Sequence, residues 1–385
     1  MSEFFTEEQE ELRKLARRIA EEKVRPRAAQ CDRTGEFPWD LIKVFADAGF
    51  YGCYIDEKYG GTGGGVTELC IVTEELSRAC GGIALAVAAT ALGAFPIILD
   101  GTDEQKQRWL PSIATGDTLT AFCLTEPEAG SDASNMKTTA RLDGDSYILN
   151  GLKHFITNAG VAKIYTVIAS TDPAKGVLGT SAFVVEEGTP GMSVGTEEDK
   201  MGIRASQTRE VIFQDCRVPK VNLLGTPGRG FINAMKTLDR SRPGVAAQAL
   251  GIAQGAFDLA IAYTQQRIQF GKPIAENQGI QWMLAEMATE IEASRALLYK
   301  TAKLIDSGAA NIAKLSAMSK LKCSDVAMRV TTDAVQLFGG YGYMKDYPIE
   351  KYMRDAKITQ IYEGTNQIQR VVIAKNLLKE AQQKS

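Results

Sequence analysis

The chain has 385 residues, of which 44% are apolar and 24% charged, a composition typical of a soluble globular protein with two or three domains. Its net charge of −3 argues against a nucleic-acid partner, because such proteins usually carry a basic face. There is a single histidine, so a multi-histidine zinc site is excluded and a Ser-His-Asp triad would have to use His154. We expect no metal ion.

Seven cysteines are scattered along the chain, and none forms a C-x-x-C pair. This odd number predicts buried, reduced thiols rather than a disulfide framework. Residues 1–6 contain neither an apolar signal segment nor an Arg-rich transit segment. The longest uncharged run, residues 83–99, is interrupted by Pro96 and is shorter than the ~20 residues of a membrane span. We therefore expect a cytoplasmic protein without a membrane segment.

The first third of the chain has helical periodicity. A capping box of Thr6 and Gln9 precedes a helix whose apolar face carries Leu12, Leu15, Ala16, Ile19 and Ala20. Further helices are predicted over residues 37–48, 66–80, 83–99 and 103–115. The glycine-rich segment 59–65 fails the G-x-G-x-x-G spacing of a dinucleotide-binding loop. Residues 1–118 are predicted to form an N-terminal all-helical domain.

The periodicity changes near residue 119. Strands are predicted over residues 119–124, 137–142, 147–150, 163–170, 181–185 and 210–213. Asp143-Gly144 is a strong signal for a tight turn between two of them. His154 lies in an alternating segment, where we expect it on a strand face. Residues 119–227 are predicted to form a small antiparallel β domain, similar to a barrel or sandwich.

Helical periodicity returns after residue 228. Pro243 is predicted in the first turn of a helix that runs to about residue 267. Helices over residues 277–306, 309–338 and 371–382 follow. Helices of this length favour a bundle, so residues 228–385 are predicted to form a C-terminal four-helix bundle. The expected fold class is α+β, mostly α, in the order helical, β, helical.

Residues 361–367 read Ile-Tyr-Glu-Gly-Thr-Asn-Gln, and they hold the candidate catalytic residue Glu363. A carboxylate among apolar neighbours has a raised pKa and is a better general base near neutral pH. The alternative is a surface glutamate at the start of a helix, where its charge suits the helix dipole.

Two segments of the β domain could hold a flat heterocycle. Residues 122–132 lead from a strand into a turn rich in hydroxyl groups and backbone donors. Phe155 and Thr157 are two residues apart, on the same face of a predicted strand. An ordinary strand-end loop and plain core packing are the alternatives at these two places.

Several of these segments together resemble the acyl-CoA dehydrogenase family. Thr125-Glu126-Pro127 with Gly130-Ser131-Asp132 is similar to its first signature. Residues 267–272 with 278–279 resemble its second flavin segment, residues 336–342 with 354–356 its last conserved stretch, and residues 361–367 its catalytic loop. The segments occur in family order between about residues 5 and 380. The chain as a whole most resembles the short-chain, butyryl-CoA dehydrogenase branch.

The resemblance implies an FAD-dependent enzyme that dehydrogenates an acyl-CoA thioester to the 2-enoyl-CoA and passes electrons to an electron-transfer flavoprotein. It makes Glu363 the base that removes the α-proton. It also implies a homotetramer built as a dimer of dimers, in which a neighbouring subunit contributes to the FAD site. FAD contacts are implied for Phe122, Thr125, Ser131, Phe155, Thr157, Arg267, Phe270, Gln278, Gln336, Phe338, Gly339, Gly340, Thr365 and Gln367. Substrate contacts are implied for Ser131, Asp239, Arg242, Tyr362 and Gly364.

Two positions depart from family patterns. Some branches place the base beside the Arg242-like residue, but Ser241 stands here and leaves Glu363 as the base. Position 155 is often Trp in relatives, and Phe155 keeps the stacking surface without the N–H donor.

The acyl group is the least determined part of this prediction. Residues 83–90, the acyl-pocket helix of the family, are small and uncharged here, which disfavours a dicarboxylic acyl group. We expect a short straight chain. A branched or cyclic chain is an alternative, as are an O₂-reactive oxidase and, more remotely, a non-catalytic flavin-binding or DNA-associated member of the fold.

Overall fold

The computed structural model describes residues 5–383, so the outermost residues of the predicted terminal domains, 1–4 and 384–385, lie outside it. The first part of the chain is helical, as predicted, and Thr6 and Gln9 form the expected capping box. A π-helical turn, Ala20–Val24, joins the first two helices, and the second of these was not predicted. The helices are α1 (Glu7–Ile19), α2 (Arg25–Thr34), α3 (Trp39–Asp47), α4 (Val66–Ala79), α5 (Gly81–Asp100) and α6 (Asp103–Ala114).

The middle of the chain forms a mostly antiparallel sheet in the order β6-β7-β3-β2-β4-β5-β8, with β1 added beside β4. The predicted hairpin joins β2 to β3. Three features were not predicted: β1 runs parallel to β4, β6 is a largely exposed edge strand whose sequence has little apolar alternation, and the two-residue strand β8 pairs with β5. The strands are β1 (Thr120–Cys123), β2 (Thr139–Asp143), β3 (Ser146–Thr157), β4 (Ile164–Ser170), β5 (Thr180–Glu186), β6 (Met192–Glu197), β7 (Thr208–Pro219) and β8 (Leu223–Leu224).

The last part of the chain is built around three long helices, and α7 packs against both α8 and α9. Two shorter helices pack on α9, and of these α10 was not predicted, while α11 begins five residues before its predicted start. The elements are α7 (Gly230–Gln266), a hairpin of β9 (Ile268–Gln269) and β10 (Lys272–Pro273), α8 (Gln278–Asp306), α9 (Ala313–Phe338), α10 (Ile349–Ile358) and α11 (Asn366–Gln382).

The predicted start of α7 at Pro243 is wrong, because the proline lies well inside the helix. A proline has no N–H, so the carbonyl oxygen of Asp239, one turn earlier, loses its helical donor. The hydroxyl of Ser316 on α9 donates to that oxygen at 2.7 Å instead. A contact between helices therefore compensates for a residue that, read locally, indicates a helix start.

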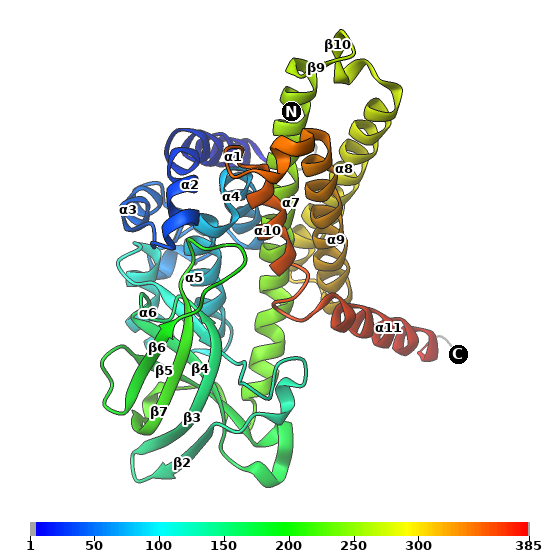
Figure 1. The fold of residues 1–385 in the computed structure, drawn as a ribbon. Coiled ribbons are helices and arrows are strands. Elements are labelled where there is room, and N and C mark those ends of the chain that lie inside the picture. The colour runs from blue at the N-terminus through cyan, green and yellow to red at the C-terminus, as the bar shows by residue number, and fades with distance from the viewer. Residues whose placement is uncertain (1–4, 384–385) are drawn as a thin grey trace.

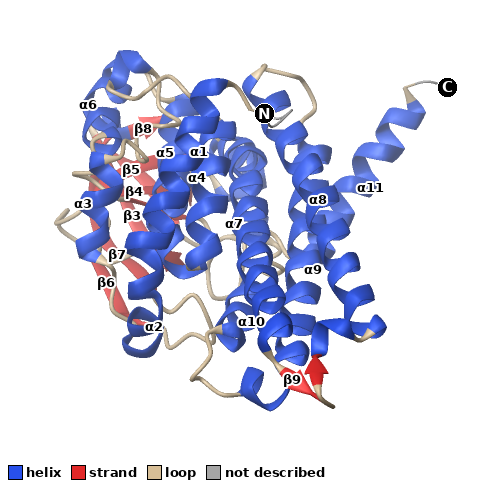
Figure 2. Ribbon diagram, turned by 90° about the horizontal axis from the view of Figure 1, so that it is seen from above, coloured by secondary structure: helices blue, strands red, loops and turns tan. Residues whose placement is uncertain are grey.

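Figure 2 shows α4 and α5 between the sheet on one side and α7, α8 and α9 on the other. The main apolar core runs through this arrangement, and a second core lies within the sheet. Helices α5 and α7 are long and apolar enough to cross a membrane by length and composition, yet most of each is buried inside the protein. All seven cysteines lie in the described part of the chain, where they are buried free thiols.

Candidate active site

Glu363 lies in the loop that connects α10 to α11, beside the middle of α7 in Figure 1. Its backbone has a φ of +52°, which is uncommon for a residue with a side chain, and Gly364 follows with a φ of +90°. This φ favours a glycine at position 364, where a Cβ would also lie 2.7 Å from the side-chain amide nitrogen of Gln369. Within residues 5–383, the N–H of Glu363 has no hydrogen-bond acceptor.

The carbonyl oxygens of this loop point toward donors inside the protein. Gln369 donates from its side-chain amide to the oxygens of Glu363 at 3.1 Å and Gly364 at 2.8 Å. Arg242 donates to the Glu363 oxygen at 3.3 Å, and Lys320 to the Gly364 oxygen at 2.9 Å. These bonds hold two consecutive left-handed residues in place, a strained geometry that persists only with such support.

The Glu363 carboxylate is held by Ser241, whose hydroxyl donates to Oε2 at 2.5 Å. Desolvation raises the pKa of Glu363 above its ordinary value, against opposing contributions from the Ser241 hydrogen bond and the charges of Arg242 and Lys320. A raised pKa is what a carboxylate base needs near neutral pH. The geometry therefore favours the general-base interpretation over the surface interpretation.

Arg242 is buried and pairs with Asp239 at 3.0 Å, one turn earlier on α7. Burial lowers the pKa of Arg242 and raises that of Asp239, and each partner opposes the shift of the other. The pair places a fixed cation directly behind the loop.

A cavity of about 290 Å³ opens in front of Glu363. One wall is apolar and is formed mainly by α4, α5 and α7, and it includes Leu85, Ala88 and Ala89 of the predicted acyl-pocket segment. Beyond that segment the wall continues with residues that were not predicted. The main apolar lining residues are Leu69, Leu85, Ala88, Ala89, Leu92, Phe95, Leu238 and Val245.

The opposite wall comes from the β domain and contains Phe122, Thr125, Ser131, Phe155 and Thr157. These five predicted residues thus share one cavity with Glu363. Phe155 reaches it from a bulge in β3, where its φ is +56° and the register against β7 shifts. Bulges re-aim side chains in this way, so the regular strand alternation that we expected does not place Phe155. Its ring is 60% exposed.

Glu126 of the first signature does not line this cavity. Its carboxylate is buried, accepts from the backbone N–H of Thr138 at 3.0 Å and pairs with Lys153 at 2.8 Å. Lys153, on β3, also donates to the carbonyl oxygen of Leu124 at 3.0 Å. This buried ion pair ties the turn after β1 to β3 and so fixes the wall that carries Thr125 and Phe155.

Tyr362 and Gly364 line the cavity beside Glu363, and the Tyr362 hydroxyl donates to Gln248 on α7. Thr365 instead caps α11 by accepting from the N–H of Ile368 at 3.3 Å. Gln367 is exposed in the first turn of α11. Asp239, Thr365 and Gln367 are therefore near the cavity without lining it.

The remaining predicted FAD contacts lie at the far end of α7, in the uppermost part of Figure 1. Arg267 ends α7, and Phe270, at the tip of the β9–β10 hairpin, is 100% exposed with a φ of +53°. Arg267 and residues 338–340 line a second cavity of about 540 Å³. Gln278 begins α8, and Gln336 is exposed near the end of α9. At 1.5 Å per residue, Arg267 is about 39 Å along the helix from Ser241.

Family models match almost the whole chain in three consecutive parts. The acyl-CoA dehydrogenase N-terminal domain matches residues 6–117, the middle domain residues 121–216 and the C-terminal domain residues 228–378. The chain belongs to the acyl-CoA dehydrogenase family. It is therefore an oxidoreductase, and FAD is the cofactor of this family.

Similar proteins agree over nearly their full length. The short-chain-specific acyl-CoA dehydrogenase of Clostridium acetobutylicum is 49% identical over 96% of this chain and 97% of its own. The structure of butyryl-CoA dehydrogenase from Megasphaera elsdenii has a TM-score of 0.95 at 48% identity, covering 97% and 99%. A chain solved with the electron transferring flavoprotein of Acidaminococcus fermentans, toward a mechanism of flavin-based electron bifurcation, has a TM-score of 0.96 at 51% identity, covering 98% and 100%.

The cavity near Glu363 fits the flavin ring. The exposed Phe155 ring offers a stacking surface, and hydroxyl groups of Thr125, Ser131 and Thr157 stand on the same wall. A large aromatic side chain with this much exposed area, facing a cavity, suits a planar partner.

Four residues of the site were missed by sequence analysis or misjudged in their importance. Ser241 was noted only as a position without an acid, whereas it contacts the base directly. Gln248, Lys320 and Gln369 were not identified, because a polar residue in a long helix has no sequence signal that separates an inward from an outward side chain. Pro243 follows Arg242 in this part of α7, but from sequence alone it indicates the start of a helix and so does not point to the site.

Proposed function

We propose that this protein dehydrogenates a short, straight-chain acyl-CoA to its 2-enoyl-CoA, with Glu363 as the base that takes the α-proton. The observation that carries the proposal is the desolvated Glu363 carboxylate, held by Ser241 at the mouth of an apolar cavity that faces the flavin-side wall. When bound, FAD supplies the acceptor for the hydride from the β-carbon.

The acyl group enters between α5 and α7, so that its α-carbon lies next to the Glu363 carboxylate. Leu85, Leu92 and Phe95 exclude water from this end of the cavity. Exclusion of water keeps the carboxylate poorly solvated, and this favours its protonated product form. The C–H bond at the α-carbon breaks, its electron pair moves to the α,β position, and the proton becomes the acid proton of Glu363.

The backbone N–H of Glu363 donates to the thioester carbonyl oxygen. That N–H has no intramolecular acceptor in the described part of the chain, whereas the carbonyl oxygens of Glu363 and Gly364 accept from Arg242, Gln369 and Lys320. A donor aimed at the developing enolate oxygen typically contributes about 3 kcal/mol to the transition state.

The assembly that we propose is a homotetramer, a dimer of dimers, in the cytoplasm. Support for the assembly is the position of Arg267, about 39 Å along α7 from Ser241, next to the fully exposed Phe270; residues there would serve the FAD of another subunit. Buried free thiols support a reducing compartment. Electrons pass to an electron-transfer flavoprotein, as the similarity to the Acidaminococcus fermentans chain suggests.

The test is anaerobic bleaching of the bound flavin by a panel of acyl-CoA thioesters. We expect butyryl-CoA to bleach the flavin fastest, isobutyryl- and cyclohexanecarbonyl-CoA more slowly, and glutaryl-CoA not at all. The apolar lining offers no cation to a second carboxylate, so a fast reaction with glutaryl-CoA would contradict the chain assignment. Fastest bleaching by a branched or cyclic substrate would move the specificity to that class.

A second measurement separates the electron acceptor from the substrate. The reduced flavin should reoxidise slowly in air and rapidly with an electron-transfer flavoprotein. Fast reoxidation by O₂ with release of peroxide would instead identify an oxidase.

A further inference from the structure

Lys320 is a fully buried lysine in the first third of α9, behind the catalytic loop. Its ammonium donates to the carbonyl oxygen of Gly364 at 2.9 Å and to the side-chain oxygen of Asn366 at 2.9 Å. Asn366 in turn donates to Ser324 at 2.9 Å and to Asp325 at 2.7 Å. Side chains of α9 therefore hold the catalytic loop at two places, the Gly364 carbonyl oxygen and Asn366, the first residue of α11.

The hydrogen bond from Lys320 to the Gly364 carbonyl oxygen is the contact that most directly affects the neighbouring base, Glu363. Glu363 and Gly364 both have positive φ, and the direction of the peptide between them and α11 decides where the Glu363 side chain and N–H point. Lys320 and Gln369 are the two donors to the Gly364 oxygen. Gln369 belongs to the same segment as the loop, so Lys320 is the contact that fixes this peptide to another helix.

We propose that Lys320 is a positioning residue that locks the Gly364 carbonyl and thereby fixes the Glu363 carboxylate and N–H toward the substrate. This inference rests on the proposed function of Glu363 and deepens it.

The charge of Lys320 has a second consequence. Desolvation lowers the pKa of Lys320 to about 7, although the negative charges of Glu363 and Asp325 oppose this and Arg242 adds to it. Asp239, paired with Arg242, is the next acid in the cluster. When Lys320 is protonated it favours the ionised form of Glu363, so loss of the ammonium raises the pKa of the base.

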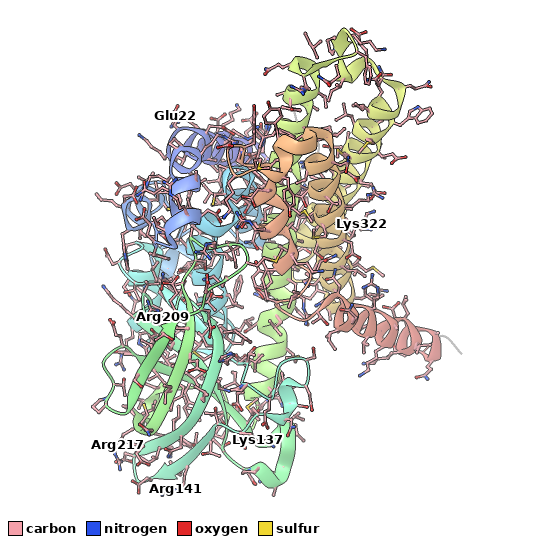
Figure 3. The ribbon with its side chains drawn as sticks, viewed as in Figure 1. Glu22, Lys137, Arg141, Arg209, Arg217 and Lys322 are labelled. Atoms are coloured by element: carbon pink, nitrogen blue, oxygen red, sulfur yellow. The ribbon has the colours of Figure 1, made fainter. Side chains whose placement is uncertain are left out.

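The test compares three substitutions at position 320 by the pH dependence of flavin bleaching with butyryl-CoA, or with the acyl-CoA that the wild type bleaches fastest. Lys320→Met removes both hydrogen bonds and the charge, Lys320→Gln can keep donors without the charge, and Lys320→Arg keeps the charge with a different shape. Lys322→Met is the matched control, because Lys322 points from the same helix toward Glu290 of α8, on the side away from the sheet (Figure 3).

We expect Lys320→Met to slow bleaching at pH 7 at least tenfold and to move the acid limb of the profile upward by about one pH unit. Lys320→Gln should move the limb equally with a smaller loss of rate, and it carries the test if the methionine variant does not fold. Lys320→Arg should leave the limb in place and lose rate. Lys322→Met should match the wild type, with FAD content equal in all four variants.

The two hypotheses fail in different ways. If the wild type bleaches normally and the limb is unmoved in both uncharged variants, the role of Lys320 is wrong and that of Glu363 stands. If no acyl-CoA bleaches the wild-type flavin, the proposed function is wrong, and the inference about Lys320 with it.

Discussion

Two regions along α7 differ in how completely their side chains are enclosed: the middle of the helix near Ser241 and Arg242, and its C-terminal end near Arg267. In the middle region, Ser241, Arg242, Lys320 and Gln369 are buried around Glu363, and each makes at least one hydrogen bond within the chain. Near Arg267, the β9–β10 hairpin carries a fully exposed phenylalanine, and residues 339–341 are also exposed. The middle region can position a base without help from another chain. The C-terminal end offers an exposed contact surface, as expected of a site that another subunit completes.

The largest effect on the rate of flavin bleaching should follow from Glu363→Gln, in the site beside the middle of α7. The amide has the shape of the carboxylate and can still accept from Ser241, so FAD and acyl-CoA binding should persist. Bleaching should slow by roughly 10²–10⁴-fold, the usual contribution of a general base. Single-turnover bleaching measures the rate, and Glu22→Gln, on the surface of the N-terminal helices in Figure 3, is the control. A near-normal rate in Glu363→Gln would remove the base from the mechanism.

The elements of the fold that were predictable from sequence are those that depend on local signals alone. The helical, β, helical order and the hairpin at Asp143-Gly144 follow from local periodicity and turn chemistry, and the structure confirms them. Pro243 misled because its missing hydrogen bond is compensated by Ser316, 73 residues later (316 − 243) in the sequence. A local pattern contains no information about such a partner.

For the site, the family motifs pointed to Phe122, Thr125, Phe155 and Glu363, which share one cavity. They did not indicate the polar residues behind the loop. Lys320 and Gln369 are fully buried, and each stands in a helix that carries both buried and exposed polar residues. Only the packing of α9 and α11 on the loop distinguishes them. The roles of all these residues stay predictions until the variants are measured.

The next largest effect, a loss of FAD affinity, should come from substitutions at the C-terminal end of α7. Phe270→Ala removes a fully exposed ring, and Arg267→Ala removes a half-buried side chain that lies over the Tyr341 ring at the end of α7, so the folded monomer should tolerate both. If these groups hold the FAD of a neighbouring subunit, each variant should bind FAD about tenfold more weakly, equivalent to about 1.4 kcal/mol. FAD retained after gel filtration at graded protein concentrations measures this.

Arg217→Ala is the control for that experiment. Arg217 pairs with Asp143 at 2.6 Å at the far tip of the sheet (Figure 3), at the opposite side of the molecule from the β9–β10 hairpin. Equal FAD retention in all three variants, or an FAD-loaded monomer of the wild type, would show that the far end serves another purpose.

The smallest effect should follow from Ser241→Ala, which removes one hydrogen bond from the base and leaves its loop intact. The Ser241 hydroxyl bonds to the Glu363 carboxylate and so lowers a pKa that desolvation raises. Removing that bond raises the pKa of Glu363 further. Because the base must be ionised, activity is lost as pH falls through this pKa, and the variant should lose it at a higher pH than the wild type.

We expect the acid limb of the Ser241→Ala profile to move upward by roughly half a pH unit, equivalent to about 0.7 kcal/mol, which is within the range of one neutral hydrogen bond. The plateau rate at high pH should fall only a few-fold, since Arg242, Gln369 and Lys320 still hold the loop. Ser241→Thr restores the hydroxyl and should return the limb to its wild-type position. A limb that stays in place in Ser241→Ala, with a lower plateau, would mean that Ser241 orients the carboxylate without tuning its proton affinity.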